Sequence, residues 1–372
     1  MNRSEPAKPA KPAKPEDPAG PEEVDRRELA PGYAVPRIIS GGWQLSQGHR
    51  RTAIDPDAAV RQMRQLANAG LTTFDCGDIY AGVEALLGKL LEISPDVQVH
   101  TKFVPDQDAL PGIDRKHVEG IIDRSLRRLG VERLDLVQFA WWDYEVPRYV
   151  ETAVWLDEQR RAGKIRLLGA TNFDVPHLAE IVAAGVPIVA HQVQYSLLDR
   201  RPERGPEHGP EQRMLGFCRE HGIHLLAYGT LGGGFLSDRH LDRPDPVPPL
   251  ANRSLVKYRL MIDEFGGWSR FQDLLGTLAR IASRHGVSIA NVATRWTLER
   301  AGVAAAIVGA FDAGHLDDNL RVFGFELAKE DLECLEPFAD AGPPGDVYAA
   351  ERVPDGRHAA IMKYNLNREA SD

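Results

Sequence analysis

Cysteine is scarce in this chain. Its 372 residues include three cysteines, Cys76, Cys218 and Cys334, which is an odd number with no Cys-x-x-Cys spacing. A disulfide framework or a thiolate metal site needs more cysteines at closer spacing. We therefore expect reduced thiols and no bound metal.

Long apolar runs and an excess of basic residues are also missing. No apolar stretch approaches the roughly 20 residues of a membrane-spanning helix, and the amino-terminus lacks the apolar core of a signal peptide. Acidic residues outnumber basic ones by 54 to 45, whereas nucleic-acid binding needs clustered Lys and Arg. We therefore expect a cytoplasmic protein that binds neither membranes nor nucleic acids, and the acidic surface favours a monomer.

The composition divides the chain into three parts. Residues 1–32 are rich in Ala, Lys, Pro and Glu and too poor in apolar residues to offset ordering entropy, so we expect a disordered tail. Residues 33–340 have the pattern of a folded domain. Residues 341–372 again contain much Pro, Gly and charge, but also Tyr348 and Met362. Two alternatives remain for this last part: a segment that covers the functional site, or disorder.

Short β-branched runs alternate with segments of helical period through residues 33–340. This alternation is typical of repeated βαβ units and a parallel sheet. Eight pairs recur, most of them about 35 residues apart, which predicts a closed (β/α)8 TIM barrel. The predicted strands are residues 38–40, 72–75, 97–102, 134–141, 165–171, 188–192, 224–227 and 304–308.

An acid, a phenol and an amine lie at the ends of the second and third predicted strands. Asp75 ends one strand, Tyr80 follows it and Lys102 ends the next strand, at the end where barrel enzymes keep catalytic groups. An ammonium lowers the pKa of a nearby tyrosine, and a carboxylate keeps that ammonium charged. We therefore expect a proton-delivery set. The alternative is a strand-end salt bridge with Tyr80 as a wall residue.

Several motifs resemble the aldo-keto reductase family, and the resemblance covers nearly all of residues 33–340. The motifs are Phe-Asp-Cys-Gly-Asp-Ile-Tyr at 74–80, Glu-Ala-Leu-Leu-Gly at 84–88, Arg-Leu-Asp-Leu-Val-Gln at 133–138, Gln-Val-Gln-Tyr-Ser at 192–196 and Ala-Tyr-Gly-Thr-Leu-Gly at 227–232. The resemblance implies an NADP(H)-dependent oxidoreductase, with NAD(H) as the alternative cofactor. Its substrate would be a small organic molecule with a carbonyl group or a conjugated double bond.

By this resemblance Asp75, Tyr80 and Lys102 are three members of a catalytic tetrad, with Tyr80 as general acid. Family members usually have histidine at the fourth position, where this chain has Ala140. Alanine cannot donate a hydrogen bond to a carbonyl oxygen, so ordinary carbonyl reduction is expected to suffer. Retargeting to another reaction, natural loss of catalysis and a deliberately introduced alanine all remain open.

Two other functions compete with reduction. One is a non-redox cyclase or dehydratase on the same barrel, and the other is an impaired reductase that acts as a cofactor-binding protein. His191 is not expected to replace the missing histidine, because it adjoins Gln192 and strand neighbours point to opposite faces.

The resemblance also implies a dinucleotide site. The residues assigned to the cofactor are Gly42, Trp43, Thr171, Asn172, Gln192, Tyr228, Gly229, Leu231, Gly233, Gly309, His315, Asp318 and Asn319. Thr171, Asn172 and Gln192 match residues that bind the nicotinamide carboxamide, and Tyr228 matches the aromatic residue that stacks on the ring.

The other cofactor residues match the pyrophosphate and adenosine ends. Residues 229–233 correspond to a loop in which missing side chains let backbone amides approach phosphate. Asp318 and Asn319 would meet the adenine. Relatives selective for NADP(H) often have cationic residues at the positions of Gly309, Asp312 and His315, so the 2′-phosphate loses its usual partners here.

Aromatic residues follow the first and fourth predicted strands and are expected to line an apolar substrate slot. The residues assigned to the substrate are Trp43, Tyr80, Ala140, Trp141 and Trp142. Because strand residues alternate between faces, some of these aromatic residues must instead belong to the core.

Overall fold

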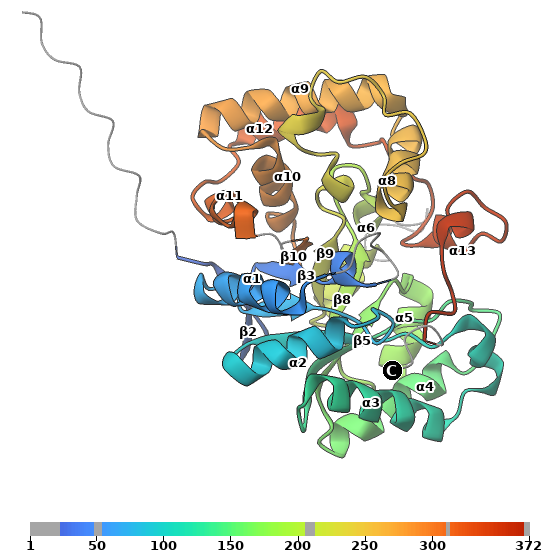
Figure 1. The fold of residues 1–372 in the computed structure, drawn as a ribbon. Coiled ribbons are helices and arrows are strands. Elements are labelled where there is room, and N and C mark those ends of the chain that lie inside the picture. Colours follow the sequence, from blue (N-terminus) through green and yellow to red (C-terminus); the bar gives the residue numbers. More distant parts are fainter. Residues whose placement is uncertain (1–22, 48–53, 205–212, 310–312, 368–372) are drawn as a thin grey trace, which may run out of the picture.

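Eight parallel strands close into a barrel in the computed structural model, which describes residues 23–47, 54–204, 213–309 and 313–367 (Figure 1). The order around the barrel is β10-β3-β4-β5-β6-β7-β8-β9. The strands are β3 (Ile38–Gly41), β4 (Thr73–Asp75), β5 (Gln98–Phe103), β6 (Leu134–Phe139), β7 (Ile165–Thr171), β8 (Ile188–Gln194), β9 (His224–Tyr228) and β10 (Val303–Val308). The predicted (β/α)8 TIM barrel is therefore confirmed.

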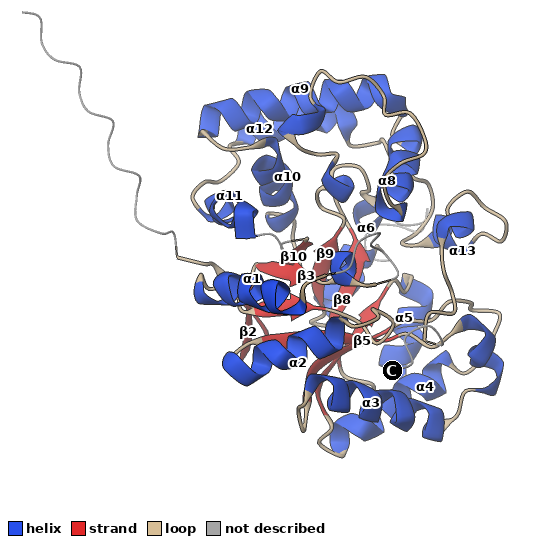
Figure 2. Ribbon diagram, in the orientation of Figure 1, coloured by secondary structure: helices blue, strands red, loops and turns tan. Residues whose placement is uncertain are grey.

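Helices surround the barrel, as Figure 2 shows by colour. The helices that follow β3 to β7 in turn are α1 (Pro56–Asn68), α2 (Val83–Ile93), α3 (Arg115–Leu129), α4 (Tyr149–Arg161) and α5 (Val175–Ala183). The remaining helices are α6 (Arg201–Arg204), α7 (Met214–Glu220), α8 (Arg253–Glu264), α9 (Gly267–His285), α10 (Ile289–Leu298), α11 (Leu316–Leu320), α12 (Lys329–Leu335) and α13 (Ala349–Arg352). Among the described residues, we find no helix with the length and apolar character needed to cross a membrane.

Helix α3 illustrates how the sequence sets these elements. Asp114 caps its start by accepting a hydrogen bond from the backbone N–H of His117 at 2.8 Å. Gly130 ends it in the left-handed conformation, with φ of 67°. Between them, residues at three- and four-residue spacing, such as Val118 and Ile122, are buried. The helix therefore packs one apolar face against the barrel.

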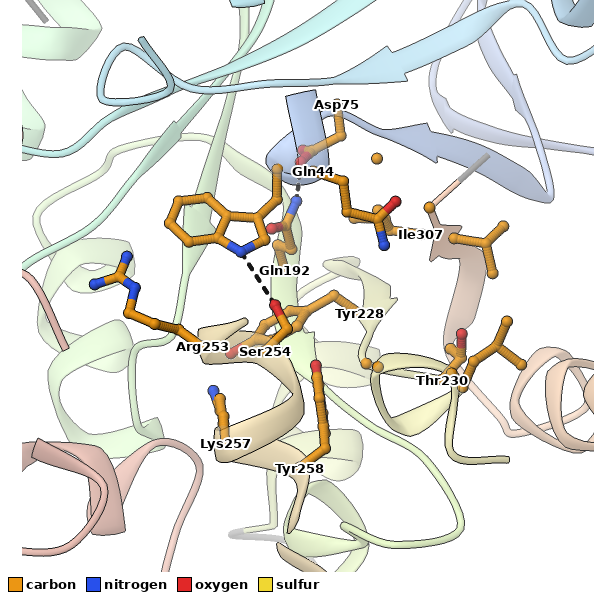
Figure 3. A pocket seen from close by; sticks show the side chains of 18 of the residues that line it. Gln44, Asp75, Gln192, Tyr228, Thr230, Arg253, Ser254, Lys257, Tyr258 and Ile307 are labelled. Atoms are coloured by element: carbon orange, nitrogen blue, oxygen red, sulfur yellow. Dashed lines mark hydrogen bonds between the residues drawn. The ribbon is translucent and has the colours of Figure 1, made fainter. Parts of the chain in front are cut away.

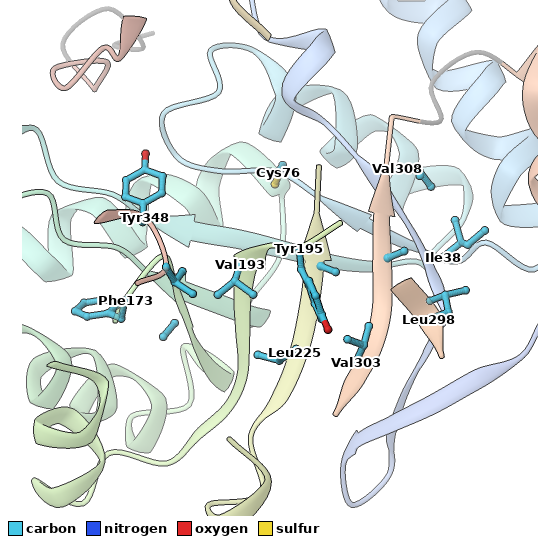
Figure 4. Packing of buried hydrophobic residues seen from close by; sticks show 14 of the residues in the cluster. Ile38, Cys76, Phe173, Val193, Tyr195, Leu225, Leu298, Val303, Val308 and Tyr348 are labelled. Carbon is cyan, nitrogen blue, oxygen red and sulfur yellow. The ribbon is translucent and has the colours of Figure 1, made fainter. Parts of the chain in front are cut away.

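The main core lies between the strands and the surrounding helices. Figure 4 shows Ile38, Val193, Leu225 and Val303 projecting from neighbouring strands into this layer. All four are buried. Since alternate strand residues point outward, the intervening ones remain to fill the barrel interior and to form its polar mouth.

A β-hairpin closes the end of the barrel where the strands begin. It consists of β1 (Arg26–Ala30) and β2 (Tyr33–Pro36), paired antiparallel. Its buried residues Leu29, Tyr33 and Val35 pack against interior residues of the barrel strands. The Tyr33 hydroxyl also lies 3.1 Å from Nε2 of His100 inside the barrel. The pocket described below is therefore at the opposite end.

The predicted boundary of the disordered tail at residue 32 is wrong. Residues 26–30 already form β1, because Leu29 of β1 and Tyr33 and Val35 of β2 become buried under the barrel. The Pro-rich part of the predicted tail, residues 1–22, lies outside the described residues. At the other end, residues 341–367 pack onto the barrel, and Val347, Tyr348 and Leu366 are buried there. We call residues 341–367 the strap.

Candidate active site

A buried ion pair joins Asp75 and Lys102 at the carboxyl ends of β4 and β5. Lys102 Nζ donates to Asp75 Oδ2 at 2.6 Å and to the carbonyl oxygen of Cys76 at 2.7 Å. The two side chains are only 5% and 6% exposed. Lys102 Nζ also lies 5.0 Å from the centre of the Tyr80 ring. The structure thus brings the three predicted catalytic residues together.

Burial is the strongest influence on the pKa of Tyr80. It raises this pKa above the ordinary value, and the Lys102 ammonium offsets only part of the rise. The expectation that Lys102 gives Tyr80 a lowered pKa is therefore wrong in net direction. Burial lowers the pKa of Lys102, but the Asp75 carboxylate and Tyr80 outweigh it, so the pKa of Lys102 is raised. At neutral pH Tyr80 keeps its proton and Lys102 its charge.

Two glutamines complete the hydrogen-bond network around Asp75. Gln138 and Gln192 donate to Asp75 Oδ1 at 2.8 and 2.7 Å, and Gln192 also donates to Gln138 Oε1 at 2.9 Å. Figure 3 shows Gln192 next to Asp75. Gln138 was not predicted as a site residue, although a buried polar residue near the carboxyl end of a strand is a usable signal. The network fixes the orientation of the carboxylate.

His191 faces away from this network. Its Nε2 accepts a hydrogen bond from the backbone N–H of Phe173 at 3.1 Å, and its Nδ1 lies 3.3 Å from the Met214 sulfur. Gln192, the next residue, reaches Asp75 inside the barrel. The two neighbours therefore point to opposite faces, as expected, and His191 does not stand in for the missing histidine.

Burial of His191 predicts a pH-dependent stability. Burial lowers its pKa to about 3, whereas the unfolded chain has a histidine pKa of about 6.5. As pH falls below about 6, the unfolded state gains a proton that the folded state does not, and stability is lost. His191→Gln, which keeps an acceptor for Phe173, is expected to remove about 1.4 kcal/mol of this loss per pH unit down to about pH 4.

The measurement is urea unfolding of parent and variant at several pH values. The difference between their unfolding free energies isolates His191 from other titrating groups. A difference that stays constant between about pH 6 and 4 contradicts a histidine that remains neutral in the folded protein.

One cavity of about 640 Å³ joins the residues that sequence analysis assigned to different sites. All the predicted catalytic, cofactor and substrate residues line this cavity except Gly42. Gly42 instead donates to the Asp75 carbonyl oxygen at 2.6 Å, and a Cβ there would lie 2.7 Å from that oxygen. Its glycine therefore allows two backbone segments to approach, and Gly41 lines the cavity beside it.

The three tryptophans that were assigned to the substrate differ in their burial. Trp43 and Trp142 are partly exposed to the cavity. The Trp141 side chain is 1% exposed, with its ring 5.9 Å from that of Phe139 and its Nε1 bonded to the carbonyl oxygen of Asp143. The Trp141 indole therefore packs in the core, although Trp141 also lines the cavity, and its assignment to the substrate stays a prediction.

Helix α8 contributes cavity residues that sequence analysis did not find. Arg253, Ser254, Lys257 and Tyr258 lie on one helical face and line the cavity, as Figure 3 shows. Lys257 Nζ is 5.5 Å from the centre of the Tyr228 ring. The spacing of one helical turn is the only local signal for this face. Its placement over the barrel depends on a long insertion.

Tyr258 packs against two of the glycines at 229–233. A Cβ on Gly229 would lie 2.5 Å from the Tyr258 hydroxyl oxygen, and one on Gly233 would lie 2.7 Å from the ring. Both glycines have positive φ, of 73° and 65°. The predicted reason for them was the approach of amides to phosphate. In the structure a tyrosine ring fills the space that their missing side chains leave.

The nicotinamide residues of the prediction are hydrogen-bonded to one another. Thr171 Oγ1 donates to the Gln192 carbonyl oxygen at 3.1 Å, and the Tyr228 hydroxyl donates to Asn172 Oδ1 at 2.9 Å. Asn172 has φ of 60°, a conformation that a non-glycine residue rarely adopts. These side chains therefore form one arranged surface at the mouth of the barrel.

At the far end of the cavity, Asp318 is engaged by helix α10. Its carboxylate accepts from Ser288 Oγ and from Asn291 Nδ2, both at 3.0 Å. Gly309 lies against Gln44, since a Cβ on Gly309 would be 2.4 Å from Gln44 Oε1. His315 and Asn319 line the same end. Asp312, which sequence analysis compared with cationic positions of relatives, lies outside the described residues.

Two proteins similar in sequence and one solved structure bear on the identity of this chain. Over 187 residues the chain is 33% identical to "Flagellar radial spoke protein 5" of Chlamydomonas reinhardtii, and the match spans 45% of this chain but only 34% of that protein. It is 28% identical over 323 residues to "Pyridoxal reductase, chloroplastic" of Arabidopsis thaliana, covering 81% of each. A solved thermostable aldo-keto reductase with the inhibitor epalrestat is 26% identical, with a TM-score of 0.65 over 85% of this chain and 100% of that one.

The family model adds the most direct evidence, because it matches residues 37–339, the whole barrel from β3 through α12. The fold, the buried Asp75–Lys102 pair beside Tyr80 and this match agree. The chain therefore belongs to the aldo/keto reductase family.

Proposed function

We propose that this protein is an NADP(H)-dependent oxidoreductase that reduces a carbonyl group or conjugated double bond of a small organic molecule. The observation that carries the proposal is the buried Asp75–Lys102 pair beside Tyr80, in the same cavity as Gln192 and Tyr228. Family membership, together with a relative named as a pyridoxal reductase, supports the same class of reaction.

The residues along the cavity fit a dinucleotide. Arg239 and Arg253 both line it and supply cationic groups for a pyrophosphate. Tyr228 offers a ring face for the nicotinamide. His315 at the far end would bind the 2′-phosphate of NADP(H) when protonated, and NAD(H) is the alternative because Gly309 supplies no cation. When bound, this group supplies the hydride for the substrate carbon.

Tyr80 supplies the proton in the proposed reaction. Its phenolic proton passes to the substrate oxygen as the carbon–oxygen double bond becomes an alcohol. The Lys102 ammonium then stabilises the phenolate, and Asp75 holds that ammonium in place at 2.6 Å. Burial suits this role, because it keeps Tyr80 protonated at neutral pH.

The test is oxidation of NADPH and NADH, followed by absorbance, with a panel of aldehydes, ketones and enones. We expect the parent to reduce some of these compounds slowly. Ala140→His is expected to raise kcat/KM for short aldehydes by about 10- to 100-fold, because an imidazole N–H can stabilise the developing oxyanion. Ala140→Leu is the matched control, since it fills the same space without a donor. If neither parent nor Ala140→His consumes either nucleotide, the proposal is wrong.

A non-redox acid–base enzyme is the second candidate, and Ala140 is the observation that favours it. Without a carbonyl-orienting histidine, Tyr80 remains as a proton donor, and the Lys102 ammonium remains to stabilise its phenolate. This pair suits the acid–base chemistry of a cyclase or dehydratase. Such an enzyme would convert a substrate while the nicotinamide absorbance stays constant. Product analysis by chromatography beside the absorbance measurement separates the two functions.

A further inference from the structure

We infer that the substrate carries an apolar chain or ring on its carbonyl carbon, that this group binds beside Ala140, and that Leu366 of the strap limits its size. The inference rests on the proposed function and names the substrate class for the same site. It concerns the part of the cavity next to Tyr80.

The space beside Ala140 has apolar walls. Ile79, Val104, Ala140 and Leu366 form one buried cluster, in which none is more than 9% exposed, and Trp142 packs against it. These residues come from four separate segments of the chain and all of them line the cavity. Where a family member usually has an imidazole, this chain therefore presents aliphatic carbon.

The indole N–H groups of the neighbouring tryptophans already donate hydrogen bonds to other residues of the protein. Trp142 Nε1 donates to the Pro105 carbonyl oxygen at 2.8 Å, and Trp43 Nε1 donates to Ser254 Oγ at 3.3 Å. The Trp43 ring also packs edge-on against Tyr80, with 5.0 Å between centroids. A hydroxyl group of a substrate placed against this wall would lose its bonds to water without replacement. An alkyl or aryl group would gain burial there.

The position of Tyr80 sets where the substrate carbonyl lies relative to this apolar wall. It packs against the apolar cluster and also lies beside Lys102. A carbonyl oxygen that takes the proton of Tyr80 therefore lies between Lys102 on one side and the apolar cluster on the other. The substituent on the carbonyl carbon then has the Ala140 space as a neighbouring surface.

Leu366 is held in place by the residue that follows it. The Asn367 backbone N–H donates to Asp106 Oδ1 at 2.8 Å, and its Nδ2 donates to the Val104 carbonyl oxygen at 2.6 Å and to Asp78 Oδ2 at 3.3 Å. Arg124 donates to its Oδ1. Four hydrogen bonds therefore fix the strap at Asn367, one residue beyond Leu366. They hold the Leu366 side chain in place as part of the cavity wall.

The first experiment measures kcat/KM of the parent for straight-chain aldehydes from propanal to heptanal. Each methylene buried against the apolar wall is expected to raise kcat/KM by about fourfold until the space is full. Glyceraldehyde, which has the chain length of propanal with two hydroxyl groups, is expected to be at least about tenfold poorer than propanal.

Variants then locate the wall. Ala140→Leu is expected to stop the increase at a shorter chain, and Leu366→Ala is expected to extend it to longer chains while lowering kcat/KM for short ones. Val353→Ala is the matched control, because Val353 lies in the same strap but is 53% exposed. It should reproduce the parent series. Thermal unfolding of each variant establishes that it is folded.

A binding measurement separates this inference from the proposed function. Primary carboxamides from propanamide to heptanamide keep a carbonyl that is not reduced, and their Kd follows from tryptophan fluorescence. Chain-length dependence that Leu366→Ala shifts supports the apolar site even when no aldehyde is reduced. Aldehyde reduction without chain-length dependence overturns the inference but leaves the proposed function standing. The same holds if Leu366→Ala and Val353→Ala behave alike.

Discussion

Replacing Tyr80 with phenylalanine is expected to lower kcat for carbonyl reduction by about 100- to 10,000-fold, the usual contribution of a positioned general acid. The change removes one hydroxyl group and keeps the ring that packs against Trp43. Binding of NADPH, measured by fluorescence, should change little, because the loss concerns the proton alone. The parent should keep its kcat up to about pH 9, since burial raises the pKa of Tyr80 above the ordinary value of about 10.

The matched control is Tyr149→Phe. Tyr149 lies on α4, and its hydroxyl donates to Glu180 on α5, away from the cavity. This variant also loses one phenolic hydroxyl, but it should retain the kcat of the parent. A Tyr80→Phe protein with kcat within about threefold of the parent would show that another group donates the proton.

Removing the Arg201 guanidinium is expected to lower the free energy of unfolding by about 3–5 kcal/mol. Arg201 donates to Asp199 at 2.9 and 2.7 Å and to Glu351 of the strap at 3.1 Å. All three side chains are at most 1% exposed. Burial raises the pKa of Glu351, but Lys257 and Arg201 outweigh it and hold this pKa below its ordinary value. In Arg201→Met, Glu351 would keep Lys257 at 3.3 Å, but the buried Asp199 carboxylate would lose its ion pair with Arg201.

Urea unfolding measures this loss. Lys329→Met is the control, because Lys329 pairs with Glu333 at 3.4 Å while both side chains are mostly exposed, at 84% and 61%. Breaking that pair should cost no more than about 0.5 kcal/mol. Equal, small losses in the two variants would contradict a buried charge network that ties α6 to the strap.

The barrel and its strand-end residues were predictable because the information is local. Most barrel strands are short runs rich in apolar residues between segments of helical period, and parallel strands bring their carboxyl ends together. Asp75, Lys102 and Gln192 follow directly from that rule. The hairpin was missed because β1 is mostly charged, with Leu29 as its one buried residue. The hairpin is stabilised by its contacts with interior residues of the barrel strands. The sequence pattern of the hairpin itself does not show those contacts.

The rest of the site depends on segments whose position is not encoded locally. Lys257 and Tyr258 belong to a helix inside a long insertion, and Leu366 belongs to a segment for which disorder was the alternative. Their packing is set by tertiary contacts such as those of Asn367. The net pKa of Tyr80 was predicted with the wrong sign because a sequence shows which charges are near but not how deeply they are buried.

The closing hairpin gives the barrel one end that is suited to attachment. The hairpin lies at the plugged end, where Arg26 donates a hydrogen bond to Thr72 just before β4. Arg27 and Glu28 of β1 are exposed there. A label or linker on one of these two residues therefore lies on the side away from the opening, whereas one placed next to Leu366 lies beside a wall of the cavity. Immobilised forms should accordingly be attached through β1.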